Sequence, residues 1–361
     1  MSTIELSNVT KYFGSLAAVR DVDLSVGAGE TVCLLGPSGC GKTTTLRIVA
    51  GLEAASDGDV LIAGRRMNDL SPSERDIAMV FQFYALYPSL TVAENIAFPL
   101  YYERTSSADR ERRVKQAAET LDLSAVLNRL PGEISEGEKQ RVAVARAIVR
   151  DPNCFLFDEP LSRLDVELRQ TMRGQIKEVL TSLSKATVIV THDQLEALTM
   201  ADRIAIMRDG LIEQVASPHA IFANPCNVFV AGFIGTPQMN LIEASYAEVA
   251  EGEAELAFGD QRFRLAVNGA SRALAKGKTM TFGVRPRAFT LAGAATAHTI
   301  SGTVELIEPM GAETLFHVRA GEIDIRVVVP REIRISPGHV VHLACDPGQV
   351  HFFDAEGKAV Q

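Results

Sequence analysis

The eight residues Gly36–Thr43, GPSGCGKT, constrain the possible fold of this chain more than any other segment. A short apolar run, TVCLLG, ends at Gly36, and TTTLRIVAG follows with apolar residues at helical spacing. Gly36, Gly39 and Gly41 let the backbone curl so that successive N–H groups point inward, and the helix dipole adds to their field. The pattern G-x-x-x-x-G-K-[ST] between a strand and a helix is typical of a phosphate-binding loop. We therefore expect a parallel α/β sheet that binds a nucleoside triphosphate at its edge.

The residue types in this loop suit contact with a triphosphate. Lys42 can reach the β- and γ-phosphates, and the Thr43 hydroxyl can bind Mg²⁺. Cys40 lies at a helix start beside Lys42, where a thiolate is stabilised, so we expect alkylation of Cys40 to block nucleotide binding. The loop residues predicted to hold the nucleotide are Gly36, Ser38, Gly39, Cys40, Gly41, Lys42, Thr43 and Thr44.

A second apolar strand, CFLFDEP, runs directly into two carboxylates, Asp158 and Glu159. In parallel sheets ligands gather at the carboxyl ends of strands, which makes this end a candidate site. Asp158 can hold Mg²⁺ through water, and Glu159 is placed to polarise an attacking water. Such a strand is more often structural when it stands alone. Behind a phosphate-binding loop it predicts a hydrolytic site.

The pattern of apolar and polar residues changes along the chain. Strand-like and helix-like segments alternate through residues 1–235 and indicate an α/β layer fold, the P-loop NTPase core. Within it, residues 88–152 become helical and polar, and we interpret them as an inserted helical subdomain. After residue 235, short alternating strands separated by Gly and Pro predict an all-β domain over residues 236–361, a barrel or a sandwich.

Composition argues against several classes of protein. A formal net charge of -9 disfavours a nucleic-acid binder, whose surface would be basic. No apolar run reaches the roughly 18 residues of a membrane span, and MSTIELSNVTKYFG lacks the pattern of a secretion signal. Five scattered cysteines favour free thiols in a reducing cytosol. We expect a cytosolic protein that can still dock on a membrane partner.

Five segments follow one another in an order that points to one family. They are the phosphate loop, FQFYALYPSLTVAENI, ISEGEKQR, FLFDEPLSRLD and VTHD. The chain resembles the ATPase subunit of ATP-binding cassette (ABC) importers, most closely those of the maltose- and glycerol-phosphate-type sugar importers. GTPQMNLIEA, FGVRP, VELIEPMGAETLFHVRAG and DPGQVHFFD look like the accessory regulatory β-domain of that branch, of OB-like or TOBE type. The resemblance covers nearly the whole chain and implies ATP and Mg²⁺ as cofactors.

The resemblance implies roles for several single residues. Phe13 would stack on the adenine ring, with neighbouring Tyr12 as the alternative. Gln82 would join the shell around Mg²⁺ and the attacking water, and FYALYP after it would face the membrane subunits. His192 would contact the γ-phosphate and hold the water in line with Glu159. The implied catalytic group is Gln82, Glu159 and His192, and the implied Mg²⁺ ligands are Thr43, Gln82 and Asp158.

The resemblance also implies partners. In such importers two ATPase subunits close head to tail and hold each ATP between the phosphate loop of one and the signature helix of the other. Closure drives two transmembrane permease subunits to alternate access, and a solute-binding protein delivers the solute to them. The ATPase subunits lie at the cytoplasmic side of the inner membrane. The second ATPase subunit can be the same chain or a different one, and no nucleic acid takes part. Asp165 in LSRLD would lie at the dimer interface, and family members often have Asn where this chain has Arg163.

The signature segment ISEGEKQR departs from the family pattern L-S-G-G-Q. Ser135 and Gly137 match the pattern and would contact the γ-phosphate on the opposite subunit. Ser135 and Glu138 fit the S-x-x-E capping box, in which Glu138 folds back on the Ser135 N–H. Glu136 would repel a triphosphate by roughly 3 kcal/mol at ~6 Å and an effective dielectric near 20. Either Glu136 weakens dimer closure or its side chain points away, and the sequence leaves both open.

Other classes of protein remain as alternatives. A soluble ABC ATPase of DNA repair or translation would carry paired cassettes or a coiled-coil insertion, and this chain shows neither. A nucleotide-dependent regulator acting through the β-domain is a third class. Among importers, the cargo could be a sugar, a polyol or a glycerol phosphate, with a polyamine, a metal or an anion as alternatives. Co-purification with two multi-span membrane proteins would separate transport from the other classes.

Overall fold

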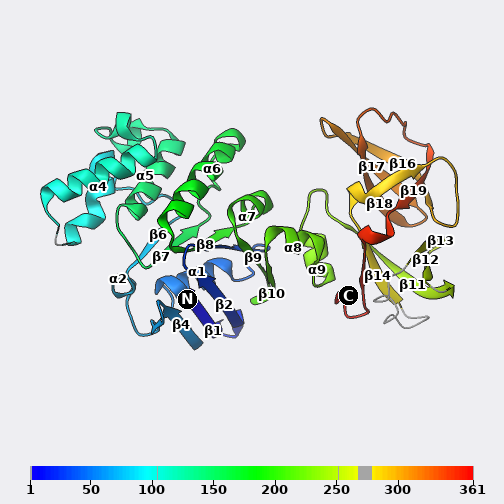
Figure 1. Ribbon diagram of the computed structural model, residues 1–361, viewed down its shortest axis with the longest axis horizontal. Helices are drawn as coiled ribbons and strands as arrows, with labels where there is room; N and C mark the ends of the chain where they lie inside the picture. The colour runs from blue at the N-terminus through cyan, green and yellow to red at the C-terminus, as the bar shows by residue number, and fades with distance from the viewer. Residues whose placement is uncertain (1, 104, 251, 267–278, 361) are drawn as a thin grey trace. The chain divides into compact units, whose positions relative to one another are not determined.

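The computed structural model describes residues 2–103, 105–250, 252–266 and 279–360 (Figure 1). The chain forms two compact units, residues 1–218 and residues 219–361. Each unit has its own strands, helices and apolar core. None of the described helices is long and apolar enough to cross a membrane.

The central sheet of the first unit carries the candidate site. In the described part of this unit the sheet has six strands in the order β10-β9-β3-β8-β7-β6, with all neighbours parallel except β10 and β9. Every residue of β3 and β8 is buried, as expected for apolar strands covered on both faces. The strands are β3 (Thr31–Leu35), β6 (Ile77–Val80), β7 (Cys154–Asp158), β8 (Ala186–Thr191), β9 (Arg203–Arg208) and β10 (Leu211–Ala216).

A second sheet of the first unit is antiparallel. Its described strands lie in the order β2-β1-β4-β5 and comprise β1 (Ser2–Phe13), β2 (Leu16–Gly27), β4 (Asp57–Ile62) and β5 (Arg65–Arg66). Side chains of this sheet, such as Val9 and Ile62, share one apolar cluster with Leu34 of β3 and Leu46 of α1 (Lys42–Ala50). The helix that follows the phosphate loop is therefore packed into the core, which fixes the position of the loop.

The helices of the first unit follow the predicted pattern. Residues 88–152, predicted as a helical subdomain, contain α3 (Val92–Ala97), α4 (Ser107–Thr120) and α5 (Glu136–Ile148) with short 3₁₀ turns between them. Figure 1 shows α4 and α5 beyond the edge of the sheet that ends in β6. The remaining helices are α2 (Pro72–Arg75), α6 (Val166–Leu183) and α7 (Gln194–Met200), and the 3₁₀ turns are η1 (Phe98–Tyr102), η2 (Ser124–Val126) and η3 (Pro131–Glu133).

The second unit is mainly β, as the sequence predicts. Among its described residues, two five-stranded antiparallel sheets run in the orders β13-β12-β11-β14-β20 and β15-β19-β16-β17-β18. Phe282 from the first sheet and Phe316 from the second belong to one buried cluster. The strands are β11 (Asn240–Ala250), β12 (Glu253–Phe258), β13 (Gln261–Ala266), β14 (Thr279–Val284), β15 (Phe289–Ala292), β16 (Ile300–Pro309), β17 (Glu313–Ala320), β18 (Ile323–Pro330), β19 (Val340–Cys345) and β20 (Val350–Phe353), with 3₁₀ turns η5 (Pro286–Ala288) and η6 (Pro347–Gln349).

The two units divide after residue 218, earlier than the boundary predicted after residue 235. The intervening helices α8 (Pro218–Ala223) and α9 (Val228–Phe233) are tied to the β unit by Arg285. Its guanidinium donates to the carbonyls of Phe222 at 2.6 Å and Ile234 at 2.8 Å, and its Cζ lies 3.5 Å from the centre of the Phe222 ring. These contacts join residues that are far apart in the sequence, so the local pattern of apolar and polar residues does not reveal them.

Candidate active site

The phosphate loop joins β3 to α1, and two of its glycines are required by close backbone approach. A Cβ atom at Gly36 would lie 2.2 Å from the Met207 carbonyl oxygen, and one at Gly41 would lie 2.4 Å from the Ala18 carbonyl oxygen. Gly41 also has a φ of 105°, which disfavours side chains. The neighbouring main chain therefore holds the curl of the loop in place.

The side chains of the loop divide into buried and exposed sets. Lys42 is buried, and its ammonium donates to the carbonyls of Gly36 at 2.8 Å and Pro37 at 2.9 Å. Ser38, Gly39 and Thr43 are exposed, and Thr44 is half-buried. The loop thus presents its hydroxyls and glycine backbone outward, while the lysine is held at its base.

Cys40 differs from the sequence-based expectation. Its Sγ lies 3.8 Å from the Lys42 Nζ, but the side chain is only 4% exposed. Burial raises the pKa of the Cys40 thiol, and the charge of Lys42 lowers it by less. The prediction of a stabilised thiolate is therefore wrong, because desolvation of the anion outweighs the nearby cation.

Asp158 lies at the carboxyl end of β7, beside the start of α1. Thr43 Oγ1 donates to Asp158 Oδ1 at 3.2 Å, so the two predicted metal ligands face each other. Burial raises the pKa of the Asp158 carboxyl, and the hydrogen bond from Thr43 opposes that shift. A bound cation would lower the pKa of this carboxyl again, because it favours the charged form.

Glu159 is the point where the predicted catalytic residues meet. Gln82 Nε2 donates to Glu159 Oε2 at 3.0 Å, and His192 Nδ1 lies 3.2 Å from the same oxygen. Glu159 has a φ of 47°, and its N–H is held by the Val190 carbonyl at 2.9 Å. Two segments that are distant in sequence, those of Gln82 and His192, therefore converge on one carboxylate oxygen of a third, that of Glu159.

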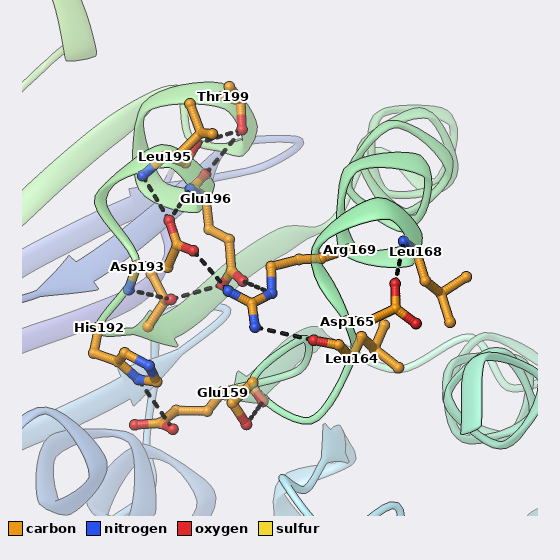
Figure 2. A network of polar contacts seen from close by, with 12 residues as sticks. Glu159, Leu164, Asp165, Leu168, Arg169, His192, Asp193, Leu195, Glu196 and Thr199 are labelled. Carbon is orange, nitrogen blue, oxygen red and sulfur yellow. Dashed lines mark hydrogen bonds and ion pairs between the residues drawn. The ribbon is translucent and has the colours of Figure 1, made fainter. Parts of the chain in front are cut away.

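Arg169 connects the loops on either side of this carboxylate and was not found from the sequence (Figure 2). From α6, it donates to the Leu164 carbonyl at 3.0 Å and to Asp193 Oδ2 at 3.1 Å. Its Nε also lies 3.9 Å from Glu196 Oε1. Asp165 accepts a hydrogen bond from the Leu168 N–H at 2.8 Å and caps α6. An arginine on a helix gives no sequence signal of such a role, because the role depends on which loops lie beside the helix.

The signature segment forms the start of α5. Ser135 and Glu138 make the predicted capping box, with Glu138 Oε2 accepting from the Ser135 N–H at 2.7 Å. Gly137 is buried, and a Cβ there would lie 2.6 Å from a methyl group of Leu168. No hydrogen bond or ion pair between described residues joins Ser135 or Gly137 to the phosphate loop. The signature residues and the phosphate loop therefore make no direct polar contact with each other in the described part of the chain.

Glu136 is not an isolated charge. Its carboxylate forms an ion pair with Lys139, one helical turn away, at 2.6 Å. The pKa of Glu136 is lowered, mainly by the hydrogen bond from Lys139. The Glu136 side chain is 53% exposed, so the carboxylate stays charged and accessible at the helix start.

The two candidate adenine-stacking rings are both available. Phe13 is 47% exposed and Tyr12 is 53% exposed at the end of β1. The Lys11 ammonium lies 4.9 Å from the centre of the Phe13 ring. Both rings are therefore accessible to a purine base.

The family models match both units. Residues 19–162 match the ABC transporter model, residues 235–289 match the MalK OB fold domain, and residues 282–353 match the TOBE domain. A dimeric ATP-binding cassette solved in a post-hydrolysis state with ADP and Pi is 34% identical. It covers 60% of this chain and 98% of its own, with a TM-score of 0.54. The chain belongs to the ABC transporter family, as an ATP-hydrolysing subunit.

Relatives that match over nearly the full length of this chain show which branch of the family it belongs to. The trehalose/maltose import ATP-binding protein MalK of Thermococcus litoralis is 42% identical over 100% of both chains. The sn-glycerol-3-phosphate import ATP-binding protein UgpC 3 of Rhizobium johnstonii is 44% identical over 99% of this chain and 98% of its own. The sulfoquinovosyl glycerol transport ATP-binding protein SmoE of Agrobacterium fabrum is 42% identical over 98% of both. The chain therefore lies in the branch of maltose- and glycerol-phosphate-type import subunits, and the predicted family and fold class are confirmed.

Proposed function

We propose that this chain works as a head-to-tail ATPase dimer that drives import of a sugar, a polyol or a glycerol phosphate. In this proposal it docks peripherally on two permease subunits at the cytoplasmic side of the membrane. Full-length similarity to import subunits for trehalose and maltose and for sn-glycerol 3-phosphate supports that class of cargo. A solute-binding protein would deliver the cargo to the permeases. The second ATPase subunit is either another copy of this chain or a paralogue.

One observation carries the catalytic part of the proposal. Glu159 Oε2 is contacted both by Gln82, at 3.0 Å, and by His192, at 3.2 Å. A carboxylate held from two sides can accept the proton of an attacking water without first reorienting. We assign Glu159 as the general base, with Gln82 and His192 as the residues that fix its direction.

The nucleotide would bind along the phosphate loop. The backbone N–H groups of residues 36–44 and the Lys42 ammonium would contact the phosphates, and Phe13 would stack on the adenine. In the closed dimer, Ser135 and Gly137 of the second subunit would complete the γ-phosphate contacts, with Asp165 at the interface. In such a dimer the signature residues of one subunit would meet the phosphate loop of the other.

The residues at the start of α1, just after β6 and at the end of β7 fit a magnesium ion. Thr43, Gln82 and Asp158 offer hydroxyl, amide and carboxylate oxygens, the ligand types that Mg²⁺ prefers. The described residues contain no group of three or more His, Cys, Asp or Glu side chains able to hold a metal, so phosphates and water would fill the remaining positions. When bound, Mg²⁺ would neutralise charge on the β- and γ-phosphates.

Replacement of Glu159 tests the catalytic assignment. Glu159→Gln should keep ATP binding while turnover falls by at least ~10²-fold, the usual scale of lost general-base catalysis. The variant should also accumulate as an ATP-bound dimer, because hydrolysis reopens the dimer. The matched control is Glu178→Gln, an exposed position on α6, which should hydrolyse ATP normally. Near-normal turnover in Glu159→Gln would remove Glu159 from the catalytic role.

Reconstitution tests the transport assignment. The chain should co-purify with two multi-span membrane proteins, and vesicles carrying that complex should take up a labelled sugar, polyol or glycerol phosphate only with ATP. Complexes containing Glu159→Gln should not transport. ATP-driven uptake of a polyamine, a metal or an anion instead would replace the proposed cargo class and keep the ATPase assignment. Failure to associate with any membrane protein would favour a soluble ABC ATPase.

A further inference from the structure

Near Glu136 lie side chains that belong neither to the proposed catalytic site nor to the phosphate loop. Glu136 stands where the family signature has glycine, and Arg163 stands where the family often has asparagine. These two departures have opposite charge. They belong to two segments that pack together, because a Cβ at Gly137 would lie 2.6 Å from Leu168, five positions after Arg163.

Arg163 is held by an aromatic ring of the segment after Gln82. Its guanidinium carbon lies 4.0 Å from the centre of the Phe83 ring, a cation–π contact. Phe83 is 66% exposed, so the stack forms at the surface, and it limits where the cation can move. The positive charge of Arg163 reaches Glu136, whose pKa it helps to lower.

Tyr84, the next residue, is buried and carries an unused hydrogen-bonding group. It is only 7% exposed, and its hydroxyl has no hydrogen-bond partner among the described residues. Its main chain is fixed, because Arg146 donates to the carbonyls of Tyr84 and Ala85, each at 2.6 Å. Burial, and then the neighbouring Glu136 carboxylate, raise the pKa of Tyr84 to about 12, so the hydroxyl keeps its proton at neutral pH.

A buried hydroxyl without a partner is unfavourable, and a carboxylate is the strongest acceptor that a protein can offer it. In this structure the Glu136 carboxylate pairs with Lys139 at 2.6 Å, at the exposed helix start. The Glu136 carboxylate already lies close enough to the Tyr84 hydroxyl and the Arg163 cation for both to help lower its pKa. A small rotation of the Glu136 side chain would therefore bring it into hydrogen-bonding distance of the Tyr84 hydroxyl. In that position the Tyr84 hydroxyl and the Arg163 cation would partly neutralise the negative charge.

We propose that Tyr84 and Arg163 form a seat that takes up the Glu136 carboxylate when the signature helix meets the ATP of the opposite subunit. The seat would let a signature with glutamate in place of glycine approach a triphosphate. Tyr84 and Arg163 are positioning residues in this scheme, because they act on the nucleotide only through Glu136. This inference rests on the proposed head-to-tail dimer.

The test measures ATP-dependent dimerisation of the full chain. All variants carry Glu159→Gln, so that ATP is retained, and sedimentation is followed across MgATP and NaCl concentrations. Tyr84→Phe removes only the hydroxyl and should weaken dimerisation by about 10-fold, the scale of one charge-assisted hydrogen bond. Arg163→Gln should weaken it by a similar factor, less so at high salt, and Arg163→Lys should restore most of the affinity.

The decisive comparison repeats these substitutions with Glu136→Gly. With no carboxylate to seat, Tyr84→Phe and Arg163→Gln should change dimer affinity by less than about 2-fold, within ordinary error of additivity. Tyr101→Phe is the matched control, because it removes an exposed tyrosine hydroxyl from the same unit of the chain. It should leave dimerisation unchanged in both backgrounds.

Two results overturn the inference, and they differ. Equal losses with Glu136 and with Glu136→Gly would mean that Tyr84 and Arg163 act structurally, and the seat would be wrong while the dimer stands. No ATP-dependent dimer in any variant, including the chain that carries Glu159→Gln alone, would reject the head-to-tail dimer and the seat together. Normal ATP binding by the monomer would show that the phosphate loop itself is intact.

Discussion

In the proposed dimer, the α1 start of one subunit and the α5 start of the other would contact the same triphosphate, yet the two starts are built differently. Helix α1 begins after Gly41, has no side-chain cap and has no acidic residue in its first turn. Helix α5 begins after Ser135, carries a capping box, and has Glu136 and Glu138 in its first turn. The first start leaves its N–H groups to a phosphate, and the second satisfies the N–H groups of Ser135 and Glu138 with its own side chains.

The difference indicates how each start takes part in binding. An uncapped helix start beside a buried lysine suits the proposed phosphate site within a single chain. A capped helix start is stable without a ligand. The start of α5 can therefore be fully formed in the monomer before a second subunit brings its nucleotide. We therefore expect changes at α1 to affect ATP binding itself, and changes at α5 to affect the meeting of two chains.

The largest effect is expected at Gly41. Gly41→Ala would force a side chain into a φ of 105° and place its Cβ 2.4 Å from the Ala18 carbonyl oxygen. We expect loss of ATP binding and destabilisation on the order of 3 kcal/mol. Equilibrium ATP titration and chemical denaturation would measure both.

Gly137→Ala is the counterpart at the other helix start. Its Cβ would meet only the flexible end of Leu168, so we expect a loss of ~1 kcal/mol and normal ATP binding by the monomer. If the two substitutions impaired ATP binding equally, the distinction between the helix starts would be lost.

An intermediate effect is expected at Ser135. Ser135→Ala removes the capping box of α5 and should cost about 1 kcal/mol of unfolding free energy, with weaker ATP-dependent dimerisation. Ser106→Ala is the matched control, because Ser106 caps α4 by accepting from the Asp109 N–H at 3.1 Å. It should lose similar stability and dimerise normally. Denaturant unfolding and sedimentation of both variants would show whether the Ser135 effect is specific to the signature.

A smaller effect is expected for the thiol at the start of α1. The pKa of Cys40 is raised by burial, so the thiol stays protonated at pH 7 and should react slowly with alkylating reagents. The rate should rise as the pH passes above about 8.5, the ordinary cysteine value, because only the thiolate reacts. Subtraction of the rate for Cys40→Ser would isolate this thiol. Rapid, ATP-protected alkylation at pH 7 would show that the thiolate is stabilised after all.

The smallest effect is expected for Glu136→Gly. An unpaired carboxylate repelled by roughly 3 kcal/mol would weaken dimerisation more than 100-fold. Because Lys139 already pairs with Glu136 at 2.6 Å, we expect its removal to tighten the Glu159→Gln dimer by only a few-fold, and by less at high salt. Sedimentation across ATP concentrations would measure the change. A gain near 100-fold would mean that neither Lys139 nor the proposed seat shields the charge.

Motifs whose chemistry is local were predictable from the sequence. The strand–loop–helix at Gly36–Thr43, the strand that ends at Asp158 and the capping box of Ser135 and Glu138 each depend on a few consecutive residues. The convergence of Gln82 and His192 on Glu159 came from family resemblance, since residue spacing alone does not bring them together.

Features that depend on long-range packing were missed. The Arg169 network, the helices held by Arg285 and the burial of Cys40 all require knowledge of which segments lie side by side. The pair of Glu136 with Lys139 lies within one helical turn and follows a known spacing rule. That spacing is present in ISEGEKQR, and the charge of Lys139 reduces the repulsion expected between Glu136 and a phosphate.

The backbone at Glu159 has a consequence for how this chain can evolve. A glutamate with a φ of 47° carries conformational strain that a glycine there would avoid, on the order of 1 kcal/mol. Selection for stability alone would therefore favour glycine or asparagine at position 159. With Glu159 as the proposed general base, a copy of the gene released from ATP hydrolysis should lose this residue early and become a more stable protein as it does so.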